Sequence, residues 1–142
     1  RQKASRIKGL AIYIVQEHAS DPRRLLEGDE DDRREELLAQ PGIGEETADA
    51  ILLFAGRRPR FIAAAYVRRL LNRLGILSSE DYGEVQRFME AELPRDAELY
   101  VQLYALMVHH ARTVCRSRPR CQACCLRDRC RFNGIAGRTD FR

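Results

Sequence analysis

One stretch decides the fold: residues 37–55, LLAQPGIGEETADAILLFA. It predicts a helix that ends near Gln40, a four-residue turn, Pro41-Gly42-Ile43-Gly44, and a second helix that begins at Glu45. The two glycines flank one apolar residue, so the turn can adopt backbone angles closed to other residues and its N–H groups can converge outward. Together these features predict a helix-hairpin-helix.

The turn of this hairpin is a candidate anion site. Free amides and the positive end of a helix dipole attract negative charge, and on a basic protein the expected anion is a nucleic-acid phosphate. We therefore expect contacts to a DNA backbone, without sequence reading, from Gly42, Ile43, Gly44 and Thr47. A plain αα-hairpin is the alternative interpretation, but the full pattern, with Thr47-Ala48 and an apolar run after the glycines, favours DNA binding.

Length and hydropathy narrow the class of protein. The 142 residues suffice for one domain or two small halves with a modest core. No apolar run reaches membrane length and no signal-peptide pattern is present. We therefore expect a cytoplasmic protein, nucleoid-associated in a prokaryote, with no membrane partner.

The basic charge is concentrated at the C-terminal end. Net charge is +4, yet residues 115–142 carry eight Arg against Asp128 and Asp140, a net of +6 that leaves −2 for the first 114 residues. This end suits a polyanion, and a merely solvated basic tail is the alternative. Only Lys3 and Lys8 are lysines, so 23 of the 25 basic residues are arginine.

Helical periodicity recurs along the chain, and no segment alternates like a half-buried strand, so the predicted class is all-α. Asp32 is the expected cap of the first hairpin helix, Gly56 the expected stop of the second, and Asp96 the cap of a later long helix. The apolar face predicted for the first helix of the chain comprises Ile7, Leu10, Ala11, Ile14 and Val15. That of the long helix comprises Leu99, Leu103, Leu106, Met107, His110 and Val114.

Five cysteines fall within sixteen residues, spaced Cys115-x5-Cys121-x2-Cys124-Cys125-x4-Cys130. Without a secretory signal, such a cluster indicates a metal centre rather than a disulfide framework. One cubane iron–sulfur cluster needs four thiolates, and Cys115, Cys121, Cys124 and Cys130 can supply them, which leaves Cys125 over. A four-cysteine zinc site agrees equally well with the spacing. Either centre would be structural, because bound thiolates leave no open coordination position for a substrate.

The hairpin and the cysteine cluster together resemble a known family. Two segments, LLAQPGIGEETADAILLFAGRRPRFIAAAYVRRLLNRLG and LMVHHARTVCRSRPRCQACCLRDRC, are similar to the endonuclease III branch of the helix-hairpin-helix DNA glycosylases. The opening RQKASRIKGLA is similar to the helix that these proteins place before the hairpin. The resemblance covers nearly the whole chain, although the first gap between cysteines is one residue shorter than the commonest pattern of the branch.

This resemblance implies two helical lobes with a DNA-binding cleft between them. The first, partial lobe is expected over residues 1–58 and contains the hairpin, and the second over residues 59–142 with the cysteine loop at 115–130. The resemblance favours a [4Fe–4S] cluster over zinc as the group held by the four cysteines named above. It also implies that an N-terminal portion of the fold, with the segment that wedges into the duplex, is missing here. We expect a monomer.

Two active-site positions depart from the family pattern. Bifunctional members carry a lysine two residues after the second glycine of the hairpin, and here that place is Glu46, which cannot form a Schiff base. Neither Lys3 nor Lys8 is near it in sequence, so a monofunctional glycosylase that uses water is favoured over one with AP-lyase activity. Alternatively, Glu46 is only a first-turn carboxylate stabilised by the helix dipole.

The second departure is at Ala64, which aligns with the catalytic aspartate of the family. Losing a charge that stabilises a developing sugar cation should raise the barrier by several kcal/mol, roughly 10²–10³-fold or more in rate. The chain is therefore expected to bind damaged DNA and to cleave it poorly. An engineered substitution is favoured over a naturally inactive paralogue, because the hairpin and the cysteine loop are intact.

The expected function is base-excision repair. A DNA glycosylase of this kind rotates a damaged or mismatched base out of double-stranded DNA and hydrolyses its N-glycosidic bond. A non-catalytic module that binds DNA and recognises damage is the competing hypothesis. The lesion stays open among oxidised pyrimidine, mismatched thymine or uracil, and alkylated purine. His110, which aligns with a family histidine, is expected to be a hydrogen-bonded core residue.

Overall fold

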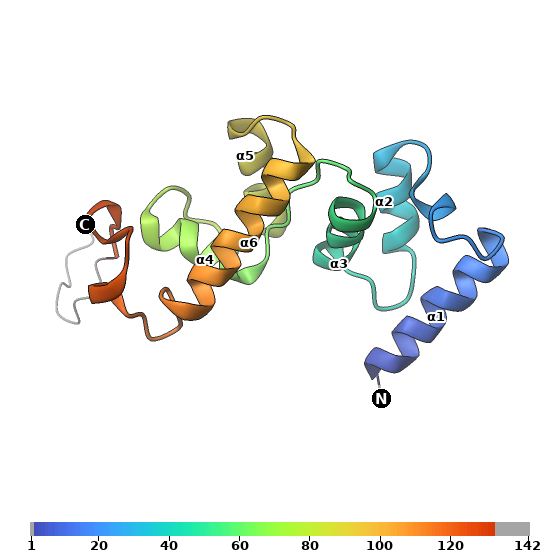
Figure 1. Cartoon of the computed structure of the whole chain (residues 1–142), viewed down its shortest axis with the longest axis horizontal. Coiled ribbons are helices and arrows are strands. Elements are labelled where there is room, and N and C mark those ends of the chain that lie inside the picture. The colour runs from blue at the N-terminus through green and yellow to red at the C-terminus, as the bar shows by residue number, and fades with distance from the viewer. Residues whose placement is uncertain (1, 133–142) are drawn as a thin grey trace. The chain divides into compact units, whose positions relative to one another are not determined.

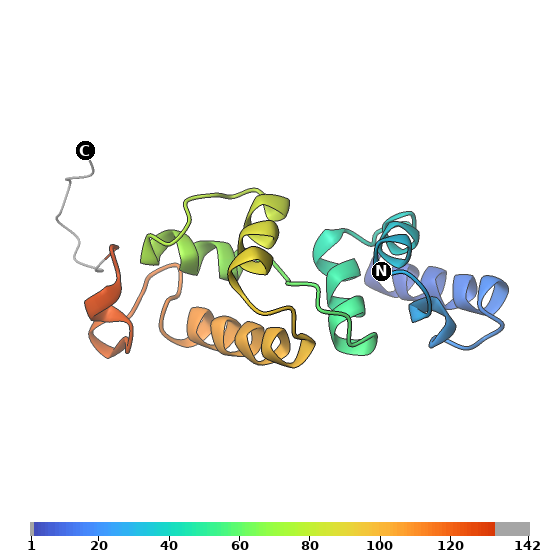
Figure 2. The same ribbon diagram turned by 90° about the horizontal axis from the view of Figure 1, so that it is seen from above.

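The computed structural model describes residues 2–132 of the chain. Within these residues every regular element is helical, which confirms the expected all-α class (Figures 1 and 2). The elements are α1 (Gln2–Glu17), η1 (Arg24–Leu26), α2 (Glu30–Leu38), α3 (Glu45–Ala50), η2 (Ile51–Ala55), α4 (Ala65–Leu74), α5 (Tyr82–Glu92), α6 (Ala97–Thr113), η3 (Cys121–Ala123) and η4 (Arg127–Arg129). None of these helices is both long and apolar enough to cross a membrane.

The described residues fall into two compact units. Residues 2–62 and 94–101 form the hairpin unit, and residues 63–93 and 102–132 form the cysteine unit. The chain thus leaves the hairpin unit after Ile62, returns to it at Pro94, and leaves it again within α6. The sequence predicted one boundary, between residues 58 and 59. In the structure the first boundary follows Ile62, and residues 94–101 belong to the hairpin unit as well.

The core of the hairpin unit is a small apolar cluster on η1, α2, α3 and η2. Its buried side chains are Leu25, Leu37, Ala48 and Leu52. From α1, three partly buried side chains pack against it, namely Leu10, Tyr13 and Ile14. Ile7 and Val15 are 71% and 58% exposed and Ala11 is exposed as well, so the apolar face predicted for α1 is wrong at these three positions. α1 meets the unit only along a narrow stripe at i, i+3 and i+4, and neighbours outside it face away.

The N-cap of α2 is Asp29, so the prediction of Asp32 is wrong. The carboxylate of Asp29 accepts hydrogen bonds from the N–H groups of Asp31 and Asp32, at 2.8 and 3.2 Å. The helix therefore begins earlier, because the first acid of the run reaches the free N–H groups of the first turn. The predicted cap of α6 is confirmed, since the carboxylate of Asp96 accepts from two N–H groups in its first turn.

The second hairpin helix changes its winding before it ends. α3 continues directly into the π-helix η2, and the N–H of Gly56 donates to the carbonyl of Ile51 at 3.2 Å. The helix stops at Gly56 as predicted, but the left-handed angle falls on the next residue, Arg57, with φ 52°. Glycine is needed at position 56 because a Cβ there would lie 2.8 Å from the carbonyl oxygen of Leu52.

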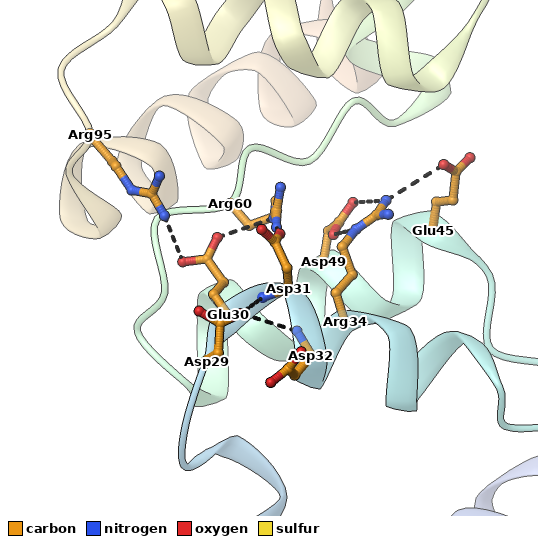
Figure 3. A network of polar contacts seen from close by, with 9 residues as sticks. All are labelled: Asp29, Glu30, Asp31, Asp32, Arg34, Glu45, Asp49, Arg60 and Arg95. Atoms are coloured by element: carbon orange, nitrogen blue, oxygen red, sulfur yellow. Dashed lines mark hydrogen bonds and ion pairs between the residues drawn. The ribbon is translucent and has the colours of Figure 1, made fainter.

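A buried ion pair fixes α2 against α3 (Figure 3). The side chain of Asp49 is 0% exposed and accepts two hydrogen bonds from the guanidinium of Arg34, from Nε at 2.7 Å and Nη2 at 3.1 Å. The hydrogen bond to Asp49 raises the pKa of Arg34, so the guanidinium keeps its positive charge. The same guanidinium lies 3.5 Å from a carboxylate oxygen of Glu45 at the start of α3.

A second polar network ties the returning segment to α2 within the hairpin unit (Figure 3). The carboxylate of Glu30 lies 3.2 Å from Nε of Arg60 and 3.0 Å from Nη2 of Arg95. Arg60 also pairs with Asp31. Two arginines from distant parts of the chain therefore meet at the first turn of α2, where acidic side chains also favour the helix dipole.

Polar contacts around Glu36 tie α1 to α2. Its carboxylate accepts a hydrogen bond from the hydroxyl of Tyr13, lies 2.6 Å from Nε2 of His18, and pairs with Arg33. The hydrogen bond to Glu36 raises the pKa of Tyr13 from 10.0 to about 12. Because the folded state holds this proton more tightly, the contact stabilises the fold below the ordinary pKa, and its stabilisation is lost as pH rises through the higher value.

The cysteine unit contains α4, α5 and the larger part of α6. Apolar side chains from all three helices are buried in it: Val67, Leu70, Leu71, Val85, Met89, Met107 and Ala111. Leu106 was predicted to face inward, but it is 67% exposed, so that prediction is wrong. On α6 the buried stripe passes through Met107 and Ala111, one turn apart, and a residue next to a stripe points about 100° away from it.

Replacing Asp49 with alanine should destabilise the protein more than removing an exposed partner. The change leaves the Arg34 guanidinium with only the more distant Glu45 carboxylate, so we expect a loss of about 3 kcal/mol in the free energy of unfolding. The matched control is Asp31→Ala, because Asp31 pairs with Arg60 but its side chain is 81% exposed, and it should cost less than about 1 kcal/mol. Urea denaturation measures both. Equal losses would mean that the buried pair does not hold the hairpin.

Candidate functional site

The hairpin turn lies at the surface. Pro41, Gly42 and Gly44 are exposed, and Ile43 is partly buried and packs against the core of the hairpin unit. Gly42 has φ +83°, an angle that side chains other than glycine rarely adopt, whereas Gly44 is the N-cap of α3 with φ −102°. The apolar residue between the glycines therefore anchors the turn while the glycine backbone faces solvent.

Several amides of this turn are available to a ligand. The N–H groups of Thr47 and Ala48 both donate to the carbonyl of Gly44 at 2.9 Å, which closes the first turn of α3. Within residues 2–132, the N–H groups of Gly44, Glu45 and Glu46 find no backbone acceptor. Such N–H groups at the start of a helix suit a phosphate oxygen.

Two carboxylates stand at the same helix start. Glu45 lies against the Arg34 guanidinium, so its charge is partly balanced. Glu46, at the position of the family lysine, is exposed in the first turn of α3. It has no amine, so it offers negative charge rather than a nucleophile for a Schiff base.

A groove between α1 and the hairpin borders the turn. One opening, of about 600 Å³, is lined by residues that include Arg6, Tyr13, Gln40 and Gly42. A second, of about 240 Å³, is lined by Lys3, Arg6, Ile7, Leu10, Gly42, Ile43 and Thr47. Sequence reasoning assigned no site residue to α1. The available signal was the position of both lysines of the chain in this helix.

The basic run at 57–60 is consumed by internal contacts. Arg58 donates to the carbonyl oxygens of Leu26 and Gly28 at 3.1 and 3.0 Å. Arg57 pairs with Glu98 at 3.1 Å, and Arg60 joins the network on α2. These guanidiniums therefore stabilise the hairpin unit through internal contacts.

Ala64, the position aligned with the family aspartate, is the N-cap of α4 and belongs to the cysteine unit. Its side chain is buried at 1% exposure and makes no capping hydrogen bond. Its carbonyl accepts from the N–H groups of Val67 and Arg68 at 2.9 and 3.1 Å. An acid at this position would stand at the positive end of a helix, which favours the ionised carboxylate.

Four of the five cysteines line one small cavity, of about 20 Å³. They are Cys115, Cys121, Cys124 and Cys130. Cys125 is exposed and is not among the lining residues. Burial raises the pKa of the Cys124 thiol. Within the described residues, no three or more His, Cys, Asp or Glu side chains are gathered as ligands of a single ion.

Two arginines of α4 hold the end of α6 and the start of the cysteine loop. Arg69 donates to the carbonyl oxygens of Ala111 and Cys115 at 2.9 and 3.2 Å. Arg73 donates to the carbonyl oxygens of Arg116 and Ser117 at 2.6 and 3.1 Å. The last carbonyls of a helix have no partner within it, and Arg69 satisfies that of Ala111. The other contacts hold the carbonyl oxygens of residues 115–117, so they set where the loop departs from the helix.

The far end of the loop returns to the same arginine. The thiol of Cys130 and the N–H of Phe132 approach the carbonyl oxygen of Arg73 at 3.2 and 3.0 Å, and the Arg73 guanidinium lies 4.6 Å from the Phe132 ring centre. His110, expected to be a core residue, is partly buried, and its Nε2 lies 3.5 Å from Sγ of Cys124. Its ring therefore lies against one of the four cysteines.

Comparisons with known proteins match the hairpin and most of the rest of the chain. A family model described as "Helix-hairpin-helix motif" matches residues 25–54. The "Putative DNA repair glycosylase MJ1434" of Methanocaldococcus jannaschii is 37% identical over 131 residues, which cover 90% of this chain and 59% of that protein. Endonuclease III of Thermotoga maritima is 30% identical, and the alignment covers 100% of this chain and 62% of that protein.

One solved structure is similar to this chain in both fold and sequence. A non-covalent endonuclease III–DNA complex matches with a TM-score of 0.74 and 26% identity, over 92% of this chain and 57% of that chain. The chain therefore spans about three fifths of the length of the relatives that it matches.

The two glycines of the turn should respond differently to alanine. Gly42→Ala forces a side chain into a left-handed angle, so we expect a loss of about 1–2 kcal/mol in the free energy of unfolding. Gly44→Ala is the matched control, because its φ is ordinary and a Cβ there meets nothing within 4 Å. It should cost less than about 1 kcal/mol. Thermal and urea unfolding test the difference, and a larger loss at position 44 would contradict the turn geometry.

Proposed function

Because the chain belongs to the endonuclease III-like branch of the helix-hairpin-helix DNA glycosylases, we propose that it acts in base-excision repair. It binds duplex DNA and hydrolyses the N-glycosidic bond of a damaged or mismatched base. The observation that carries this proposal is the exposed turn at Gly42 and Gly44, whose free amides suit a phosphate.

The turn grips the sugar–phosphate backbone in this proposal. The amides of Gly44, Glu45 and Glu46 donate to phosphate oxygens, while Ile43 holds the turn against the core and Thr47 borders the contact. Such contacts fix the register of the duplex without reading bases, so recognition depends on the nucleotide that leaves the stack.

The bond-breaking step is hydrolytic in this proposal. A sugar that loses its base develops positive charge, which a carboxylate beside it stabilises. Position 64 is suited to that role because it caps α4, where a helix dipole keeps a carboxylate ionised. With alanine there, the charge is missing and the reaction slows. Glu46 supplies no amine, so water is the nucleophile and no covalent enzyme–DNA adduct forms.

The cysteine loop is proposed to hold a [4Fe–4S] cluster through Cys115, Cys121, Cys124 and Cys130. The donor set fits, since these four thiols line one cavity and a cubane cluster takes four thiolate ligands. Arg73 and Arg127 also line the cavity, and their positive charges offset those of four thiolates. Such a cluster supplies no reaction step and pins the loop through its metal–thiolate bonds.

A second candidate function is a non-catalytic module that binds damaged DNA. Ala64 specifically favours it, because a chain without the pocket acid retains the hairpin and can still grip a duplex. The two candidates share the same DNA contacts and differ only in base release. They are therefore separated by restoring the acid rather than by measuring affinity.

Ala64→Asp should switch on base release. We expect a rate increase of about 10²–10³-fold on at least one duplex among those carrying oxidised pyrimidine, mismatched thymine or uracil, or alkylated purine. Release is read as alkali-labile strand breaks, and borohydride should trap no adduct. Ala65→Asp is the matched control, since Ala65 is exposed in the first turn of the same helix and should stay silent. Silence of both variants with intact binding would support the non-catalytic module.

Cysteine-to-serine variants should separate the cluster ligands from the spare thiol. Cys125→Ser should keep a broad visible absorption band together with bound iron and acid-labile sulfide, because Cys125 is exposed and outside the cavity. Cys124→Ser should lose all three. A colourless parent protein that contains zinc would overturn the iron–sulfur proposal and leave the four-cysteine site intact.

A further inference from the structure

We propose that α1 is part of the DNA interface, with Lys3 and Arg6 binding the phosphate backbone beside the hairpin turn. The proposal rests on the proposed function, because it extends the surface that grips duplex DNA. It adds an element of the fold and two residues that the hairpin motif itself does not contain.

Arg6 lies directly against the glycine turn. A Cβ placed on Gly42 would lie 2.5 Å from Nε of Arg6 and 2.7 Å from its Cγ, so the side chain of Arg6 fills the space that glycine leaves open. Lys3 and Arg6 line the same opening as Gly42 and Thr47. The side chains of α1 therefore border the backbone that is proposed to bind phosphate.

The charges of Lys3 and Arg6 are uncommitted within residues 2–132. Neither side chain forms a hydrogen bond or an ion pair there, and both residues are exposed. The arginines elsewhere in the hairpin unit are mostly engaged, and those held by carboxylates or carbonyls are Arg23, Arg33, Arg34, Arg57, Arg58, Arg60 and Arg95. Free cations beside the turn are thus a particular feature of α1, and free cations are what a phosphate backbone requires.

α1 carries three basic residues, Lys3, Arg6 and Lys8, and only the first two lie beside the turn. Lys3 and Arg6 are three residues apart, so they share one face of the helix, whereas Lys8 points elsewhere and lines neither opening beside the turn. No acid lies in residues 2–16 of the helix, whose single acidic residue is Glu17. This positive face also counteracts the carboxylates of Glu45 and Glu46, which by themselves would repel a phosphate at the start of α3.

The test compares salt dependence among variants of the whole protein. The probe is a fluorescent duplex with a stable abasic-site analogue, and its Kd is measured at several salt concentrations by anisotropy. Replacing both Lys3 and Arg6 with glutamine should lower the slope of log Kd against log salt by about 2, because about one unit is lost per phosphate contact. Lys8→Gln is the matched control, with the same helix and charge change, and should leave the slope nearly unchanged.

The outcomes separate this inference from the proposed function. Arg6→Lys should retain the slope, since the charge is kept, and all these exposed variants should keep the parent's melting temperature. If the parent binds and Gly42→Ala weakens binding, but the double variant matches Lys8→Gln, the α1 proposal is overturned and the hairpin interface stands. A parent that does not bind the duplex would overturn both. If Lys8→Gln lowered the salt slope as much per charge as the double variant does, binding would reflect the overall positive field of the protein and not a site. That result would also overturn the inference.

Discussion

The hairpin keeps its shape because one guanidinium and one buried carboxylate hold its two helices together. Removing the guanidinium would leave the fully buried carboxylate without its two-hydrogen-bond partner, a cost of several kcal/mol that is large against the stability of a small unit. The pair between Arg34 and Asp49 uses two hydrogen bonds of fixed geometry, so α2 and α3 cannot slide without breaking both. The turn between them is therefore positioned before the proposed contact with DNA, and its amides would need no reordering on binding.

Arginine side chains make many of the polar contacts that hold the described elements together. The net charge therefore overstates the positive charge that is free to bind a ligand. Arg58 and Arg60 hold the hairpin unit, and Arg69 and Arg73 tie α4 to the cysteine loop through carbonyl oxygens. A planar guanidinium with five donors suits these multiple contacts better than an ammonium does. The charge available to a polyanion is consequently the part not used in this way. In the hairpin unit it includes the exposed cations of α1.

The sequence was sufficient for the helices, the glycine turn and the cap at Asp96, because these depend on local periodicity and on short side-chain-to-backbone contacts. It failed where tertiary contacts choose between similar neighbours. Asp29 caps α2 rather than Asp32 within one acidic run, and only the path of the preceding chain decides which acid meets the free N–H groups. Ile7 and Leu106 are apolar at helical spacing, yet both are exposed, since periodicity reports a stripe and not what covers it. The return of residues 94–101 to the hairpin unit has no local signal at all.

In the proposed function, position 64 is a backbone site where an acid would serve stability and catalysis together. Catalytic acids often cost stability, because burying a carboxylate without partners is unfavourable. At an N-cap, the same carboxylate accepts hydrogen bonds from the first turn of the helix and faces its positive end, which offsets part of that cost. Ala64 makes no capping hydrogen bond. Its side chain is buried, however, and so are those of its neighbours Ala63 and Ile62. The start of α4 is therefore held by buried apolar side chains and does not depend on a capping side chain at position 64.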